Sequence, residues 1–459
     1  MNIVIIGAGD IGIHLATIFS QLDYGIVLID IDAHKLEQAT RDLDVGVRLG
    51  SGNDWELLEE ILEIRPDLLI ALTDDDENNL VACTIAKNLG YPQTIARIRS
   101  DHYFKQSRLH FDRLFAVDYL IGPEKLTADA ILNMILYPGS IMTENFAHGS
   151  IQMRTVKVPP SWRREEIPLK QREKLNLSSD MMVGLINRPL YAKGKVAPYQ
   201  ETLIFPHGED TLHPKDEVTF VGETEAISQL HKFFGVPMKI PESALIVGGS
   251  LIGINLARKL IDHGIRVRIV EKDFGKCQFL SEKLPQCTVI HRDGTDYRFL
   301  QAEKVDEVGV FVACARSDEV NFLAGSIAQD LGCEEIIISL SNTDYLPLLE
   351  KQGINHAASP RIYAANKILS IAREKTIASM VSMYNNQAEV MEVKVSSGSK
   401  MAGIPIRLLG PQLPKDFLIV AIQSRGRVFV ADGDRVLSPG DTVVVISSPK
   451  HVDEIRELF

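Results

Sequence analysis

An internal duplication constrains this sequence more than any other feature. The segment from residue 2 reads NIVIIGAGDIGIHLATIFSQLDYGIVLIDID, and the segment from residue 243 reads SALIVGGSLIGINLARKLIDHGIRVRIVEKD. Adding 241 to a residue number takes Gly7 to Gly248 and Asp30 to Glu271. Such a repeat has to be recognised first, because it makes the fold two copies of one unit rather than a single large domain.

The repeat extends along most of the chain with small shifts of register. An offset of 242 takes Asn79 to Asn321, and the tails LHPKDEVTFVG and LSPGDTVVVIS correspond at an offset of 225. Because the offset falls from 242 to 225, the first copy carries a longer insertion, which we place between Asn187 and Asp210. Each copy is therefore a two-part unit.

Each copy begins with alternating strand and helix patterns. VIIG, GIVLID and DLLIAL are continuous apolar runs, which are typical of parallel strands buried on both faces. An amphipathic helix is expected after each block, at about 124–136 and about 361–383, and short strands and turns follow it. The sequence therefore predicts an α/β fold with two tandem Rossmann-like parallel-sheet domains, each followed by a small α+β C-terminal subdomain. We expect the first Rossmann-like domain with its crossover helix at 1–137 and the first C-terminal subdomain at 150–234. A linker follows at 235–242. The second Rossmann-like domain with its crossover helix is expected at 243–384, and the second C-terminal subdomain at 387–459.

The first copy carries a dinucleotide-binding pattern. G-x-G-x-x-G follows a strand and opens a helix, over Gly7, Ala8, Gly9, Asp10, Ile11 and Gly12. The first glycine permits the turn, the second lets a pyrophosphate approach the backbone, and the third lets the helix pack closely on the strand. Asp30 follows 18 residues later at the end of the next strand, where it suits ribose hydroxyls and disfavours a 2′-phosphate. Further candidates at the carboxyl ends of the next two strands are Thr73, Asp74 and Arg97.

The second copy departs from this pattern. Its loop is Gly248, Gly249, Ser250, Leu251, Ile252 and Gly253, so a serine stands in place of Gly9, and Glu271 stands in place of Asp30. Ala315, Arg316 and Ser339 replace the other three candidates. We expect this site to bind nucleotide more weakly than the first site or to prefer a different nucleotide; the alternative is a structural remnant.

Composition excludes several classes of protein. The formal charge is −12 and the pI about 5.5, which disfavours nucleic-acid binding. No apolar run approaches 18 residues, the start resembles no secretory signal, and the five cysteines form no C-x-x-C. No P-loop lysine follows the glycines, and the histidines lack ligand spacing, so we predict no catalytic residue and no metal site. The acidic run from Asp74 to Glu77 is expected to start a helix, with a cation site as the alternative.

Three functions remain open on these patterns. A dehydrogenase needs a substrate domain and a proton donor near the nicotinamide, and the small modules offer little room for either. A transcription factor needs a DNA-binding motif and a basic surface. A sensor that converts nucleotide occupancy into domain movement fits the organisation best. An NAD-dependent dehydrogenase is the alternative.

The residues resemble a known family, the TrkA-type regulatory subunits of Trk potassium-uptake systems, whose repeating unit is the RCK or KTN domain. The resemblance rests on IIGAGDIG with Asp30, on ALTDDDENNLVA, on ARIRS, on the duplication and on LSPGDTVVVIS. It implies a non-enzymatic, cytoplasmic subunit, peripheral on the inner face of the membrane. It also implies NAD or NADH and ATP or ADP as ligands, a ring of such domains, and a potassium-translocating partner of TrkH or TrkG type.

The resemblance also implies contacts residue by residue. In the first copy these are the glycine loop, Asp30, Gly52, Asn53, Thr73, Asp74 and Arg97; in the second they are the loop, Glu271, Asp293 and Gly294. Asp10 and Asp74 depart from the family pattern by placing acids near the phosphates, which we expect to disfavour a triphosphate. The sequence leaves open which nucleotide activates, what the small modules bind, and the oligomer size.

Overall fold

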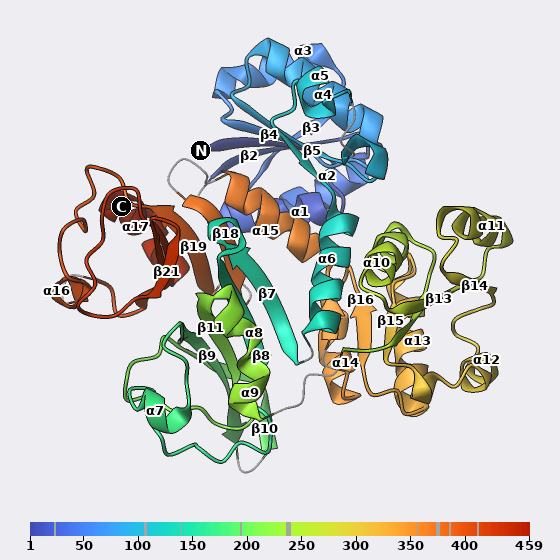
Figure 1. Ribbon diagram of the computed structural model, residues 1–459. Helices are drawn as coiled ribbons and strands as arrows, with labels where there is room; N and C mark the ends of the chain where they lie inside the picture. The colour runs from blue at the N-terminus through green and yellow to red at the C-terminus, as the bar shows by residue number, and fades with distance from the viewer. Residues whose placement is uncertain are drawn as a thin grey trace. The chain divides into compact units, whose positions relative to one another are not determined.

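The computed structural model describes residues 1–22, 24–104, 108–137, 139–192, 195–235, 240–354, 356–372, 377–384, 387–410 and 413–459. They form two compact units, and each unit contains part of both sequence copies (Figure 1). Unit one comprises Met1–Leu132 with Pro241–Ile368, and unit two comprises Asn133–Ile240 with Leu369–Phe459. Within the described ranges, no helix is long and apolar enough to span a bilayer.

The first lobe of unit one is a parallel sheet of order β3-β2-β1-β4-β5-β6. Its strands are β1 (Asn2–Ile6), β2 (Gly25–Asp30), β3 (Gly46–Leu49), β4 (Leu68–Ala71), β5 (Gln93–Arg97) and β6 (Tyr119–Ile121). Its helices are α1 (Asp10–Gln21), α2 (Ala33–Asp42), α3 (Trp55–Ile61), α4 (Asp76–Leu89), α5 (Phe111–Leu114) and α6 (Pro123–Leu136). Helices lie on both faces of this sheet (Figure 1). The apolar residues of β1 and β4 are therefore all buried, as the continuous runs predicted.

The second lobe repeats this topology, with order β14-β13-β12-β15-β16-β17. Its strands are β12 (Ser243–Val247), β13 (Arg266–Glu271), β14 (Thr288–His291), β15 (Val310–Ala313), β16 (Ile336–Ser339) and β17 (His356–Ala358). Its helices are α10 (Leu251–Asp262), α11 (Phe274–Lys283), α12 (Tyr297–Ala302), α13 (Asp318–Asp330), α14 (Leu346–Lys351) and α15 (Pro360–Ala372). The predicted pair of Rossmann-like domains is confirmed.

Unit two holds two antiparallel sheets of five strands, which correspond strand by strand: β10-β9-β11-β8-β7 matches β21-β20-β22-β19-β18. The first has β7 (Ser140–Phe146), β8 (Ile151–Lys157), β9 (Met181–Ala192), β10 (Lys195–Ile204) and β11 (Glu217–Glu223), with α7 (Arg172–Leu175), α8 (Thr224–Ser228) and α9 (Leu230–Phe234). The second has β18 (Ile377–Met383), β19 (Ala388–Lys394), β20 (Phe417–Ser424), β21 (Arg427–Val430) and β22 (Thr442–Ser447), with α16 (Ile406–Leu409) and α17 (Val452–Leu458). The predicted α+β subdomains are confirmed.

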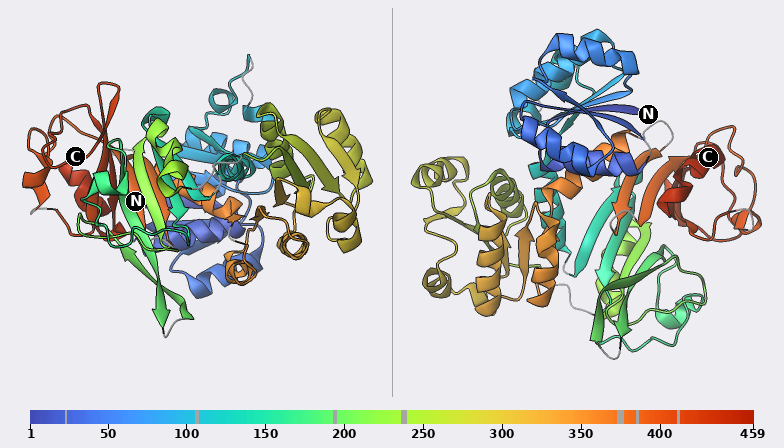
Figure 2. Two further views of the ribbon diagram at one scale, coloured as in Figure 1. Left: turned by 60° about the horizontal axis from the view of Figure 1, so that its bottom comes forward. Right: turned by 180° about the vertical axis from the view of Figure 1, so that it is seen from behind.

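The structure differs from the sequence prediction at the second connecting helix. A helix expected to reach residue 383 ends at Ala372, and Ile377–Met383 forms β18, which pairs with β19. Length and periodicity do not separate a short buried strand from a helix, and here the backbone pairing decides. The predicted insertion coincides with the long β9–β10 hairpin, which protrudes from its sheet (Figure 2). Of the predicted linker, residues 236–239 lie outside the described residues.

The two subdomains of unit two share one hydrophobic core. Phe146, Ile151 and Leu185 of the first pack with Val390, Val420, Val444 and Ile446 of the second. Hydrogen bonds also join them: Ala147 N donates to Glu392 Oε2 at 2.9 Å, and Gln423 Nε2 donates to Ser150 Oγ at 2.8 Å. The duplication therefore folds as an internal pair.

Candidate nucleotide site

The first glycine loop has the geometry that a phosphate cradle needs. Gly7 adopts φ +105°, which favours glycine, and a Cβ on Gly12 would lie 2.0 Å from the carbonyl oxygen of Gly7. A Cβ on Gly9, in contrast, would meet no atom within 4 Å. Gly7 and Gly12 are thus required by the turn itself, whereas Gly9 leaves open space above the loop.

The N-terminus of α1 faces this open space. Gly9 is its N-cap and contributes no side chain to satisfy the first N–H groups. Asp30 Oδ2 accepts a hydrogen bond from Ala8 N at 2.6 Å, and Asp30 Oδ1 accepts one from Asp32 N at 2.9 Å. Each carboxylate oxygen keeps a second lone pair for a ribose hydroxyl. The residues therefore fit a dinucleotide: donors for a pyrophosphate stand beside an acceptor for a ribose.

Two buried side chains, Asn79 and Asp76, fix the backbone at the carboxyl ends of β4 and β5. Asn79 accepts from Thr73 N at 2.9 Å and donates to the carbonyls of Thr73 and Arg97 at 3.0 and 2.9 Å. Asp76 accepts from the N–H groups of Arg99 and Ser100, both at 2.8 Å. In the second lobe Asn321 makes the corresponding hydrogen bonds to the backbone at the ends of β15 and β16. Asp318 makes the corresponding bonds to the loop after β16.

The acidic run from Asp74 to Glu77 is the start of a helix. Asp75 caps α4 by accepting from Asn78 N at 2.7 Å, and Glu77 accepts from the hydroxyl of Tyr103 at 3.0 Å. In the part of the chain that the structure describes, no group of three or more His, Cys, Asp or Glu side chains could hold a metal ion. These bonds support the expected helix start.

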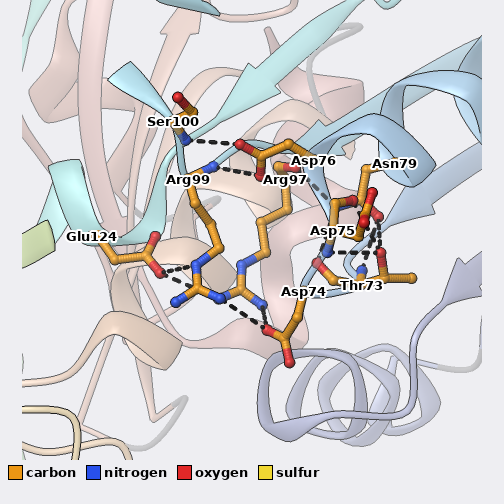
Figure 3. A network of polar contacts seen from close by, with 9 residues as sticks. All are labelled: Thr73, Asp74, Asp75, Asp76, Asn79, Arg97, Arg99, Ser100 and Glu124. Atoms are coloured by element: carbon orange, nitrogen blue, oxygen red, sulfur yellow. Dashed lines mark hydrogen bonds and ion pairs between the residues drawn. The ribbon is translucent and has the colours of Figure 1, made fainter. Parts of the chain in front are cut away.

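Two arginines and two carboxylates form a network beside the loop (Figure 3). Arg97 lies 3.2 Å from Asp74 and 3.3 Å from Glu124, and Arg99 lies 3.5 and 3.2 Å from the same two carboxylates. Sequence reasoning identified Arg97 and Asp74 but missed Arg99 and Glu124. The alternation in ARIRS, which puts both arginines on one side of an extended chain, was the available signal for Arg99.

A cavity of about 1350 Å³ in unit one joins these features. Most first-copy candidates line it: Gly7, Ala8, Gly9, Asp10, Ile11, Asp30, Gly52, Asn53, Thr73, Asp74 and Arg97. Gly12 does not, because this residue of α1 is buried against the carbonyl of Gly7. Gly52 packs on β1, since a Cβ there would lie 2.4 Å from Ile6 Cγ2. Arg99 and Glu124 line the same cavity, as do His14 of α1 and Arg361 of α15. Burial and the nearby charge of Arg361 lower the pKa of His14 to about 4.

The second glycine loop is closed by its own serine. Ser250 Oγ donates to the Cys314 carbonyl at 2.5 Å and accepts from Gly253 N at 3.2 Å, so this side chain caps α10. One of the helix N–H groups that a phosphate needs is therefore already bonded. Ser250, Leu251 and Ile252 line the cavity, whereas Gly248, Gly249 and Gly253 do not.

The remaining second-copy candidates have structural contacts. Glu271 is 7% exposed, and its carboxylate accepts from Gly249 N at 2.8 Å and Asp273 N at 2.9 Å. Asp293 accepts from the hydroxyl and the N–H of Thr295, and these bonds lower its pKa. Gly294 packs on β12, because a Cβ would lie 2.2 Å from Val247 Cγ1. These three residues do not line the cavity, and their contact with a nucleotide stays a prediction.

Comparison with known proteins defines the class. The TrkA-N domain matches residues 3–121 and 244–360, and the TrkA-C domain matches 390–459. The chain belongs to the TrkA family of Trk-system potassium uptake proteins.

Particular relatives cover the whole chain. It is 31% identical to the Trk system potassium uptake protein TrkA homolog 1 of Methanosarcina mazei, with all of both chains covered. It is 28% identical to TrkA of Haemophilus influenzae, covering all of this chain and 98% of that one. Two solved structures share the fold at 16% identity, each covering 99% of this chain. They are the GsuK RCK domain (TM-score 0.63, 94% of that chain) and the GsuK channel bound to NAD (TM-score 0.63, 78% of that chain).

Proposed function

We propose that this protein is a nucleotide-responsive, non-enzymatic regulatory subunit of a potassium uptake system. It acts from the cytoplasmic face of the membrane on a potassium-translocating membrane subunit of TrkH or TrkG type, and copies of the chain assemble into a ring of RCK domains. The full-length relatives named as Trk system potassium uptake proteins support the transport role. The potassium-uptake family to which the chain belongs argues against the dehydrogenase alternative.

One observation carries the nucleotide part of the proposal. The N-terminus of α1 is uncapped beneath open space at Gly9, with Asp30 and Arg97 lining the same cavity. Helix N–H groups and the helix dipole bind the pyrophosphate, and Asp30 accepts from the adenosine ribose. NAD or NADH is the expected ligand, with ATP or ADP competing for the same loop. A solved relative of this fold, the GsuK channel, is bound to NAD.

Two helices connect the site to the rest of the molecule. The division between units falls inside α6, between Leu132 and Asn133, and inside α15, between Ile368 and Leu369. A displacement at the start of either helix therefore has a covalent path into unit two. A ligand shifts the conformation only if it binds one state more tightly than the other, so the two nucleotides must differ in their contacts at this edge.

The test is potassium flux in liposomes that contain the membrane subunit, with this chain added outside. We expect NADH and ATP to change the flux by different amounts, and the chain to co-purify with a potassium transporter from membranes. A flux that ignores every nucleotide, while binding is intact, contradicts the regulatory role. Oxidation of bound NADH by a small carbonyl compound would instead favour an NAD-dependent dehydrogenase.

A further inference from the structure

The charges beside the first glycine loop cancel one another. The guanidinium groups of Arg97 and Arg99 each lie within 3.5 Å of both the Asp74 and Glu124 carboxylates (Figure 3). Two positive and two negative charges therefore sum to zero at the place where a nucleotide's phosphates would lie. A neutral cluster adds little electrostatic attraction for each additional phosphate charge on a ligand.

The two carboxylates differ in their access to water. The Glu124 side chain is 13% exposed and the Asp74 side chain 85% exposed. Water screens an exposed charge far more than a buried one, so Glu124 provides most of the neutralisation. The network is also incomplete: Arg97 Nε and Glu124 Oε2 are buried without a hydrogen-bond partner in the described part of the chain.

Comparison with the second lobe shows that the fold does not require this cluster of charges. Its α15 begins at Pro360 as α6 begins at Pro123, so Arg361 stands at the position of Glu124. Serines 339 and 341 stand at the positions of the two arginines. The second lobe nevertheless has the same sheet and the same Asn321 and Asp318 clamps. The four charges are thus not needed to close this edge of a Rossmann-like sheet.

We infer that Glu124 determines which phosphate chain the first lobe accepts. By neutralising Arg97 and Arg99, it makes the site favour the two phosphates of a dinucleotide over the more highly charged chain of a nucleoside triphosphate. This inference rests on the proposed nucleotide site. Asp74 acts in the same direction with less effect because it is exposed.

Calorimetric titration of the full chain with NADH and with ATP, without divalent cations, tests the assignment. Glu124→Gln keeps the shape and removes the charge, and we expect it to raise the affinity for ATP relative to NADH about tenfold, or about 1.4 kcal/mol. Asp74→Asn is expected to give a smaller rise. Glu63→Gln, an exposed carboxylate that does not line the cavity, controls for net charge and should leave the ratio unchanged.

A compensating pair distinguishes charge from fold. Arg99→Gln alone is expected to lower the ATP-to-NADH affinity ratio, and the Arg99→Gln, Glu124→Gln double variant to restore it to within about threefold of wild type, because the cluster is again neutral. If the role of these residues is purely structural, the losses of nucleotide affinity caused by the two substitutions should add in the double variant. A ratio unchanged in Glu124→Gln, with NADH still bound, overturns the inference. Wild-type protein that binds neither nucleotide overturns the proposed site itself.

Discussion

Replacing Gly9 with serine transfers the second lobe's closed loop into the first. Ser250 shows what the new side chain does: it accepts from the N–H three residues on, at 3.2 Å, and caps the helix. No atom lies within 4 Å of a Cβ at Gly9, so the substitution causes no clash. The variant therefore gains a cap that the wild-type loop lacks, and its fold should be more stable by a few tenths of a kcal/mol.

Binding should change in the opposite direction. The new hydroxyl fills the space for the pyrophosphate and occupies one helix N–H group. Loss of one hydrogen bond to a charged group costs about 1.5–3 kcal/mol, which corresponds to roughly 10-fold to 150-fold weaker NADH binding. Stability and affinity thus move with opposite signs, which a general disruption of the lobe does not produce.

Urea unfolding and NADH titration of the full chain measure the two effects. Ser250→Gly is the reciprocal variant: it removes a cap from α10 and should lower stability slightly, the opposite of the effect of Gly9→Ser. If Gly9→Ser binds NADH with wild-type affinity, the phosphates do not approach this glycine. If affinity and stability fall together, the loss reflects folding, and the assignment of Gly9 as the open position of the loop is wrong.

Three further predictions follow from the same contacts. Gly12→Ala puts a Cβ 2.0 Å from the Gly7 carbonyl and should cost about 1–3 kcal/mol in urea unfolding. Asn79→Asp removes the donors that join the ends of β4 and β5, and should destabilise unit one by about 3 kcal/mol in the same assay. His14 has its pKa lowered to about 4 from 6.5, so as pH falls through this range the unfolded chain takes up the proton first and stability is lost. The loss should be of the order of 1 kcal/mol, since His14 is only partly buried, and urea unfolding of His14→Gln between pH 7.5 and 5 should not show it.

The glycine loop could be predicted because its requirements are local. A positive φ at Gly7 and the close approach at Gly12 follow from a strand that turns directly into a helix, and both are present. The same local rule identified the departure at Ser250. What it did not indicate is that this serine also bonds Cys314, 64 residues away, and so joins the loop to β15.

The arginine network could be predicted only in part. Arg97 and Asp74 lie at adjacent strand ends, which a parallel sheet brings to one edge. Glu124 comes 27 residues after Arg97, at the first turn of a helix whose phase relative to the sheet is set by tertiary packing. Neither hydrophobic period nor motif spacing fixes that phase, so a structure was needed to find the second carboxylate.

The duplicated sequence unit is not the unit that folds. A Cβ at Gly184, in the first copy, would lie 2.4 Å from Ile446 Cδ1, in the second, so the backbone of β9 packs directly against a side chain of β22. Phe146, Val221 and Val420 are fully or almost fully buried in the same shared core. Cutting the chain between the copies would expose that core on both products. Sequence similarity reports that each half is a copy, but the side chains that bury each other belong to different halves. The pairing therefore gives the second copy a structural role in the shared core of unit two, although its own glycine loop is closed by Ser250.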